Sequence, residues 1–218
     1  QGVPCPKSRL MLEPWGLFMD NGKGGGMAGI SAHGAYVPRL RLARSAIAAA
    51  HQWSDPSFKG KGKGERAIAN WDEDAITMAV EAARDALCRA GPKRIDGIYF
   101  ASTSLPFQDR QNAGIIAEAL NAGSSVLTMD VTGSQRAGTT ALTAALKAAG
   151  AGDRIIVAAG EKRHAKAASP IELTSGDAAG TLVVAEGDGV RVAIAARQID
   201  TELVIDILDG RRHRKAQA

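Results

Sequence analysis

The chain has 218 residues, which is long enough for one domain with a substantial core. Its 27 Lys and Arg residues outnumber 23 Asp and Glu residues, giving a formal net charge of +4. Apolar residues make up 45% of the chain, and no apolar run is long enough to cross a bilayer. Two cysteines do not make a disulfide framework. We therefore expect a cytoplasmic protein with no membrane segment.

The positive charge gathers in two places. Residues 211–215 form a basic run near the end of the chain, and Lys59, Lys61 and Lys63 alternate with glycine. A nucleic-acid interface needs a basic face with stacking aromatic residues, and neither segment contains them. We expect no nucleic-acid partner and interpret residues 201–218 as a solvated basic tail.

Residues 1–26 lack hydrophobic periodicity and are rich in Gly and Pro, so we predict an irregular, disordered leader. From Met27 onward, apolar strand patterns alternate with amphipathic helix patterns. The predicted strands cover residues 29–36, 97–102, 125–131, 154–159, 180–186 and 190–198. The predicted helices cover residues 41–53, 72–89, 111–121 and 135–149, and residues 55–69 form a loop.

This alternation predicts a single α/β domain over residues 27–200. The sheet should be mixed, parallel in its centre, and covered by helices on both faces. Gly91-Pro92 should stop the helix that begins near Asp72. Cys88 falls within that helical pattern, where we expect it to be buried as a small apolar residue.

The helix predicted over residues 135–149 is the most distinctive element. From Ala137 to Leu146 it carries no charge, and a helix that is apolar all round is expected to be buried. The preceding strand reaches it through a Gly133-Ser134 turn. The positive end of a helix dipole stabilises anions and lowers the pKa of a nucleophile. The residue presented there is Gln135, whose carboxamide is not a nucleophile.

Three further motifs could have a catalytic or ligand-binding role, but each also has a simpler structural interpretation. Ser134 or Thr132 could act as a nucleophile only with an adjacent base, and no His lies near; capping of the helix by Ser134 is the alternative. Residues 59–66 lack the spacing of a phosphate-binding loop. The acidic residues 72–74 complement a helix dipole, so we expect no metal site there.

Four segments carry a resemblance to a known family: residues 29–39, 70–83, 130–142 and 175–180. Together they resemble the N-terminal half of thiolase-like enzymes, closest in appearance to 3-hydroxy-3-methylglutaryl-CoA synthases and more distantly to β-ketoacyl synthase III. The resemblance implies an α/β layered fold, with a mixed, mostly parallel five-stranded sheet and a buried central helix. Residues 201–218 could then be the truncated start of the second half.

The resemblance also implies acyltransferase chemistry on CoA thioesters. In the family, a Cys at the start of the buried helix takes the acyl group. Gln135 stands at that position, and Thr103 stands where we place the acid/base Glu of the synthase. Gln135 could donate a hydrogen bond to a thioester carbonyl or merely fill the first turn of the helix. In some relatives within polyketide synthases, Gln at this position accompanies decarboxylation of malonyl groups without condensation.

The resembled family places residues 59–66 near the CoA entrance. There Lys59, Lys61, Lys63 and Arg66 could contact the CoA phosphates, or they could form a solvated loop. We predict an acyl-CoA-handling protein with no tightly bound cofactor, inactive alone or dependent on a partner. The alternative is a non-catalytic acyl-CoA-binding or scaffolding subunit. The resemblance implies a homodimer or a complex with another thiolase-type subunit.

Overall fold

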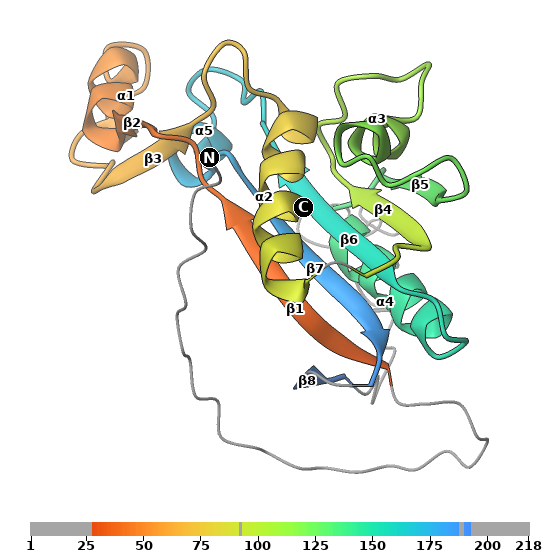
Figure 1. Cartoon of the computed structure of the whole chain (residues 1–218). Helices are drawn as coiled ribbons and strands as arrows, with labels where there is room; N and C mark the ends of the chain where they lie inside the picture. The colour runs from red at the N-terminus through yellow and green to blue at the C-terminus, as the bar shows by residue number, and fades with distance from the viewer. Residues whose placement is uncertain (1–27, 92, 188–189, 193–218) are drawn as a thin grey trace, which may run out of the picture.

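The computed structural model describes residues 28–91, 93–187 and 190–192 (Figure 1). The predicted leader at residues 1–26, the predicted tail at 201–218 and most of the strand predicted over 190–198 lie outside the described residues. The strands are β1 (Ala28–Tyr36), β2 (Leu40–Ala43), β3 (Glu65–Ile68), β4 (Gly97–Ala101), β5 (Leu127–Val131), β6 (Ile155–Glu161), β7 (Ala178–Glu186) and β8 (Val190–Arg191). The helices are α1 (Arg44–His51), the 3-10 helix η1 (Pro56–Phe58), α2 (Ala75–Ala90), α3 (Asn112–Ala119), α4 (Ala137–Ala149) and α5 (Pro170–Thr174).

The main sheet has the strand order β5-β4-β6-β7-β1-β8. β4 pairs in parallel with β5 and β6, whereas the pairs β6-β7, β7-β1 and β1-β8 are antiparallel. The mixed five-stranded sheet is confirmed, with the two-residue β8 added at one edge, but its parallel part is limited to three strands. The connection from β6 to β7 contains the five-residue α5, and β7 returns antiparallel to β6.

Strands β2 and β3 form a separate antiparallel ladder. The helix predicted over residues 41–53 therefore begins later, at Arg44, and the predicted loop 55–69 contains η1 and β3. β2 has two exposed residues followed by two partly buried ones. It thus lacks the period-two burial that marks a strand packed on a core.

Helices cover both faces of the main sheet, as predicted (Figure 1). Alternate strand residues divide between two cores, because successive side chains point to opposite faces. Helices α2 and α3 pack with Ile98, Phe100 and Ile156 on one face. Helix α4 packs with Tyr99 and Val157 on the other face.

Helix α2 begins with a capping box. The Asp74 carboxylate accepts a hydrogen bond from the Thr77 N–H at 2.8 Å, and the Thr77 hydroxyl accepts one from the Asp74 N–H at 2.7 Å. The helix lies directly on β1 at Gly34, where a Cβ atom would come within 2.2 Å of the Ala82 carbonyl oxygen. Only glycine permits this approach.

Helix α4 is buried on one side, and the expected burial of Cys88 is wrong. Helix α4 buries Ala141 and Ala145 against the sheet, while Thr139 and Thr140 on its outer side are exposed within the described structure. The exposed residues on the outer side are small and uncharged, so the sequence gives no sign that this side of the helix is not covered. Cys88 is exposed because its position on α2 faces away from the sheet. No helix among the described residues is long and apolar enough to span a membrane.

Candidate functional site

An open cleft of about 510 Å³ lies at one end of the main sheet. The carboxyl ends of β1, β4 and β6, the start of β7 and the start of α4 meet there. The wall consists largely of small residues: Ala35, Val37, Ala101, Ser102, Ser134, Gln135, Ala137, Gly138, Ala159, Gly160, Glu161, Ala178, Ala179 and Gly180. Strand pairing changes from parallel to antiparallel at β6. Ligands of α/β sheets commonly bind at carboxyl strand ends of this kind, where the strand order or direction changes.

The small side chains of the wall follow from close packing of the elements around it. A Cβ atom on Gly160 would lie 2.7 Å from the Ala75 carbonyl oxygen at the start of α2. Because position 160 has no side chain, the start of α2 can pack directly against β6 at the strand end that lines the cleft.

Gln135 is exposed and lines the cleft from the turn before α4. Gly133 has a φ of +85°, which suits glycine and allows the chain to turn sharply after β5. The Ser134 hydroxyl accepts a hydrogen bond from the Arg136 N–H at 3.2 Å, and its carbonyl accepts one from the Ala137 N–H at 3.0 Å. Ser134 thus shapes the turn, while the N-cap is Arg136 and not Ser134 as predicted.

A carboxylate reaches the cleft from an unpredicted position, Glu161 at the end of β6. One oxygen accepts a hydrogen bond from the Thr103 N–H at 2.6 Å. The other oxygen accepts bonds from the hydroxyls of Thr103 and Ser104, each at 2.9 Å. Thr103, which we placed where the family has a Glu, therefore holds the carboxylate of another strand.

Ser104 ties the same two strand ends together. Its hydroxyl accepts a hydrogen bond from the Lys162 N–H at 2.9 Å, and its own N–H donates to the Ser102 hydroxyl at 3.0 Å. With both its oxygens bonded, the Glu161 side chain has one fixed orientation beside the cleft.

A second polar cluster lies on the α2 face of the sheet. Tyr36 donates a hydrogen bond to one oxygen of Glu73, and the Asn70 N–H donates to the other at 2.7 Å. The Asn70 bond, then the Tyr36 bond and the charge of Lys162 hold the pKa of Glu73 below its usual value. The same bond to Glu73, together with burial and nearby acidic groups, raises the pKa of Tyr36. Glu73 therefore fixes the segment before α2, which explains part of the acidic run at residues 72–74.

Asp130 on β5 organises the loop that leads into α3. Its carboxylate accepts hydrogen bonds from the N–H groups of Asn112 and Ala113, both at 2.7 Å, at the start of α3. The buried Asn112 side chain in turn bonds both the N–H and the carbonyl of Phe107. This carboxylate therefore stabilises the start of α3.

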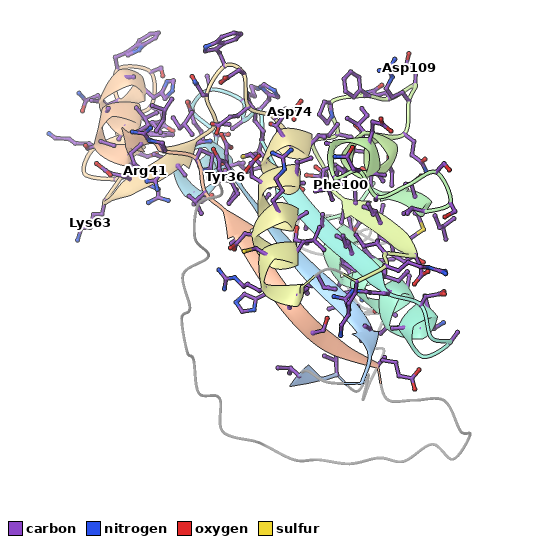
Figure 2. The ribbon with its side chains drawn as sticks, viewed as in Figure 1. Tyr36, Arg41, Lys63, Asp74, Phe100 and Asp109 are labelled. Carbon is purple, nitrogen blue, oxygen red and sulfur yellow. The ribbon has the colours of Figure 1, made fainter. Side chains whose placement is uncertain are left out.

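The predicted CoA-binding residues separate into two groups. Lys59, Lys61 and Lys63 are exposed in the loop between η1 and β3. Figure 2 shows Lys63 extending outward from the ladder of β2 and β3. Arg66 is buried at 8% exposure, and it donates to the Glu172 carbonyl at 2.9 Å. A guanidinium engaged inside the fold cannot meet a phosphate arriving from solvent, so Arg66 serves the packing of β3.

No metal-binding cluster of three His, Cys, Asp or Glu side chains occurs among the described residues. Asp74 caps α2 and Glu73 bonds Tyr36, so two of the three acidic residues at 72–74 have structural partners.

Comparison with known proteins gives a consistent picture. Hydroxymethylglutaryl-CoA synthase of Thermococcus onnurineus is 34% identical over 169 residues, covering 76% of this chain and 47% of that protein. The fold resembles 3-oxoacyl-(acyl carrier protein) synthase III of Pseudomonas aeruginosa, with a TM-score of 0.63 and 23% identity over 74% of this chain and 51% of that one. It also resembles OleA of Xanthomonas campestris with bound lauric acid and lauroyl-CoA, with a TM-score of 0.62 and 20% identity over 73% of this chain and 56% of that one. No family model matches the sequence.

The fold is thiolase-like. The resemblance to hydroxymethylglutaryl-CoA synthase, predicted from four sequence segments, is confirmed. The chain spans about half the length of the curated relatives it matches.

The fold brings Gln135, Ser134 and the carboxylate held by Thr103 to one cleft. Arg66, in contrast, is buried on β3 against the segment at residues 172–177. Sequence reasoning missed Glu161. A signal was present, since Glu161 is the first charged residue after the apolar strand Ile155–Gly160. A charged residue at the carboxyl end of a buried strand is well placed to reach a cleft there.

Proposed function

We propose that this chain binds acyl-CoA thioesters in the cleft at the start of α4. The observation that carries the proposal is that Gln135 borders this cleft. In the resemblance described above, Gln135 stands where the family has its acyl-accepting Cys. Support comes from the similarity to hydroxymethylglutaryl-CoA synthases and from the fold shared with OleA, whose structure holds lauroyl-CoA.

In this proposal Gln135 polarises the thioester instead of attacking it. A carboxamide cannot form the covalent acyl intermediate of the family. Its N–H group can donate a hydrogen bond to the thioester carbonyl oxygen, where negative charge develops during acyl chemistry. The chain would then lack acyl transfer on its own and would depend on a partner for a nucleophile.

The remaining parts of the proposal concern the surroundings of this cleft. Lys59, Lys61 and Lys63 remain candidates for contact with the CoA phosphates, because they are exposed cations. We propose a homodimer, or a complex with another thiolase-type subunit, in the cytoplasm.

A second candidate function is a non-catalytic, acyl-CoA-binding or scaffolding subunit. The cleft favours it, since its lining within the described structure contains no Cys, His or Lys that could attack an acyl group. Assays of acyl transfer with the chain alone and with a co-purified subunit separate the two functions. Activity that appears only with the subunit, and is lost on Gln135→Ala, supports the catalytic one.

Isothermal titration with acetyl-CoA, with free CoA as the control ligand, tests the binding itself. We expect saturable binding that is stronger for the thioester, because only acetyl-CoA offers a thioester carbonyl oxygen to Gln135. A folded chain that binds neither ligand contradicts the proposal.

A further inference from the structure

Strands β2 and β3, with α1 and η1 between them, form one unit over residues 40–68, which we call the ladder unit. It carries Lys59, Lys61 and Lys63, the candidates for contact with the CoA phosphates. The cleft is built instead from strands of the main sheet and the start of α4. In the described part of the chain, the ladder and the main sheet are separate sheets. One acyl-CoA molecule can contact both only if their separation is fixed.

Polar contacts attach the ladder unit to the segment between β6 and β7. Arg44 Nε donates a hydrogen bond to the Leu173 carbonyl at 2.6 Å, and Arg66 Nη1 donates one to the Glu172 carbonyl at 2.9 Å. The His51 imidazole lies 3.2 Å from the Glu172 carboxylate. Since these contacts come from β3 and from both ends of α1, they fix the orientation of the unit as well as its position.

Asp177 is the attachment that lies next to the cleft in the sequence. The following residue, Ala178, begins β7 and lines the cleft. The Asp177 N–H donates to the Ala67 carbonyl at 3.1 Å, and one carboxylate oxygen accepts from the Ala69 N–H at 2.8 Å. The other oxygen lies 3.7 Å from Arg66 Nη2. Asp177 thus joins β3 directly to the strand that forms one wall of the cleft.

The contact between Arg66 and Asp177 is a buried ion pair. The residues are 8% and 4% exposed, so salt and water screen the attraction between their charges weakly. Separating the pair would leave either charge poorly solvated inside the fold, which is costly. The pair therefore resists displacement of the ladder unit away from the cleft.

We propose that Arg66 and Asp177 are positioning residues that hold the ladder unit at the separation from the cleft that one acyl-CoA molecule requires. The proposal rests on the acyl-CoA binding proposed above and adds how the two ends of the site are kept in place. Two linked contacts strengthen each other only when one ligand can reach both at once. The cleft wall is also secured by the main sheet, where Ala178 pairs with Glu161. Loss of the ion pair should therefore displace the ladder unit and leave the cleft in place.

The test compares acetyl-CoA with its two ends in titrations of the full chain. S-acetylpantetheine represents the acyl end without phosphates, and 3′-phospho-ADP represents the nucleotide end. Asp177→Asn removes the charge of the pair and keeps a side-chain oxygen for the Ala69 N–H. We expect this variant to bind acetyl-CoA about tenfold more weakly than the wild-type chain, because its two contacts are no longer aligned. Its affinity for each separate end should change by less than about twofold.

Glu81→Gln is the matched control, since it removes a carboxylate from an exposed ion pair on α2. It should bind all three ligands like the wild-type chain, and a melting curve verifies that each variant is folded. If Asp177→Asn does not fold, the double variant with Arg66→Met removes the pair without leaving an unpaired buried charge. The double variant should show the same selective loss for acetyl-CoA.

The results that overturn the proposal are distinct from failure of the proposed function. A folded variant that binds acetyl-CoA like the wild-type chain, or that weakens all three ligands equally, shows that the pair does not align the two ends. If neither variant folds, the wild-type chain decides. It must bind acetyl-CoA at least about tenfold more tightly than either end alone, and equal affinities show that no ligand spans the two parts. A wild-type chain that binds none of the three removes the proposed function as well.

Discussion

Glu161 and Lys162 are consecutive residues whose side chains act on opposite faces of the main sheet. The Glu161 carboxylate bonds Thr103 beside the cleft, whereas the Lys162 ammonium group donates to the carbonyl oxygens of Asn70 and Glu73 before α2. The alternation of side chains at the end of a strand produces this division. The end of β6 thus connects the wall of the cleft with the segment that starts α2.

Lys162→Met should weaken the attachment of residues 70–74 to β6. The variant loses two hydrogen bonds from a partly buried charged group, and each carbonyl loses a partner. We expect the free energy of unfolding to fall by about 1–3 kcal/mol in urea denaturation. Lys166→Met is the control, because Lys166 is exposed. Equal losses for the two variants would contradict this role of Lys162.

The lowered pKa of Glu73 should make the free energy of unfolding depend on pH in the acid range. The pKa of Glu73 is lower in the folded chain than in the unfolded chain, so its contribution is fully present above the ordinary glutamate value of about 4.5. That contribution is lost as the pH falls through the folded value. Glu73→Gln should be less stable than the wild-type chain at neutral pH and should lose less stability on acidification. Denaturant titrations at neutral pH and about pH 3 measure the difference, and parallel pH profiles for the two proteins would refute the assignment.

Gly34 is a position where one methyl group should be costly. A Cβ atom there would lie 2.2 Å from the Ala82 carbonyl oxygen and 2.4 Å from the Ala86 nitrogen, both in the backbone of α2. We expect Gly34→Ala to lower the free energy of unfolding by about 2 kcal/mol or more. In Gly114→Ala the new Cβ meets only the Gln111 side chain at 3.7 Å, so this helical control should gain stability. A neutral Gly34→Ala would show that α2 does not lie so close to β1.

Gln135→Cys tests whether position 135 has the environment of a nucleophile. A thiol at the positive end of α4 should have a lowered pKa and react with iodoacetamide faster than Cys88. Cys88 is a suitable internal reference because it is exposed. Peptide mapping by mass spectrometry follows both sites in one sample, and equal rates in the folded variant would rule out this environment.

Much of the fold was predictable, because it depends on long apolar patterns. The patterns of β4, β6 and α2 identify their elements, and Gly91 ends α2 as predicted. The ladder of β2 and β3 was missed, since its two four-residue strands show no alternation of buried and exposed residues and are paired through non-local contacts.

The candidate site was predictable only in part. Gln135 could be located from the strand, turn and uncharged helix around it, all of which are local features. The contact between Thr103 and Glu161 joins residues 58 positions apart and exists because β4 and β6 are neighbours in the sheet. The burial of Arg66 depends on the segment at residues 172–177, far along the chain. Neither relationship can be read from local sequence.

The most direct test of the account is titration of wild-type chain and Gln135→Ala with acetyl-CoA and with free CoA. If Gln135 donates a hydrogen bond to the thioester carbonyl, the variant should bind acetyl-CoA about fivefold to tenfold more weakly. Its affinity for free CoA should be unchanged. Unchanged affinity of folded Gln135→Ala for acetyl-CoA would contradict the central claim that this cleft presents Gln135 to an acyl thioester.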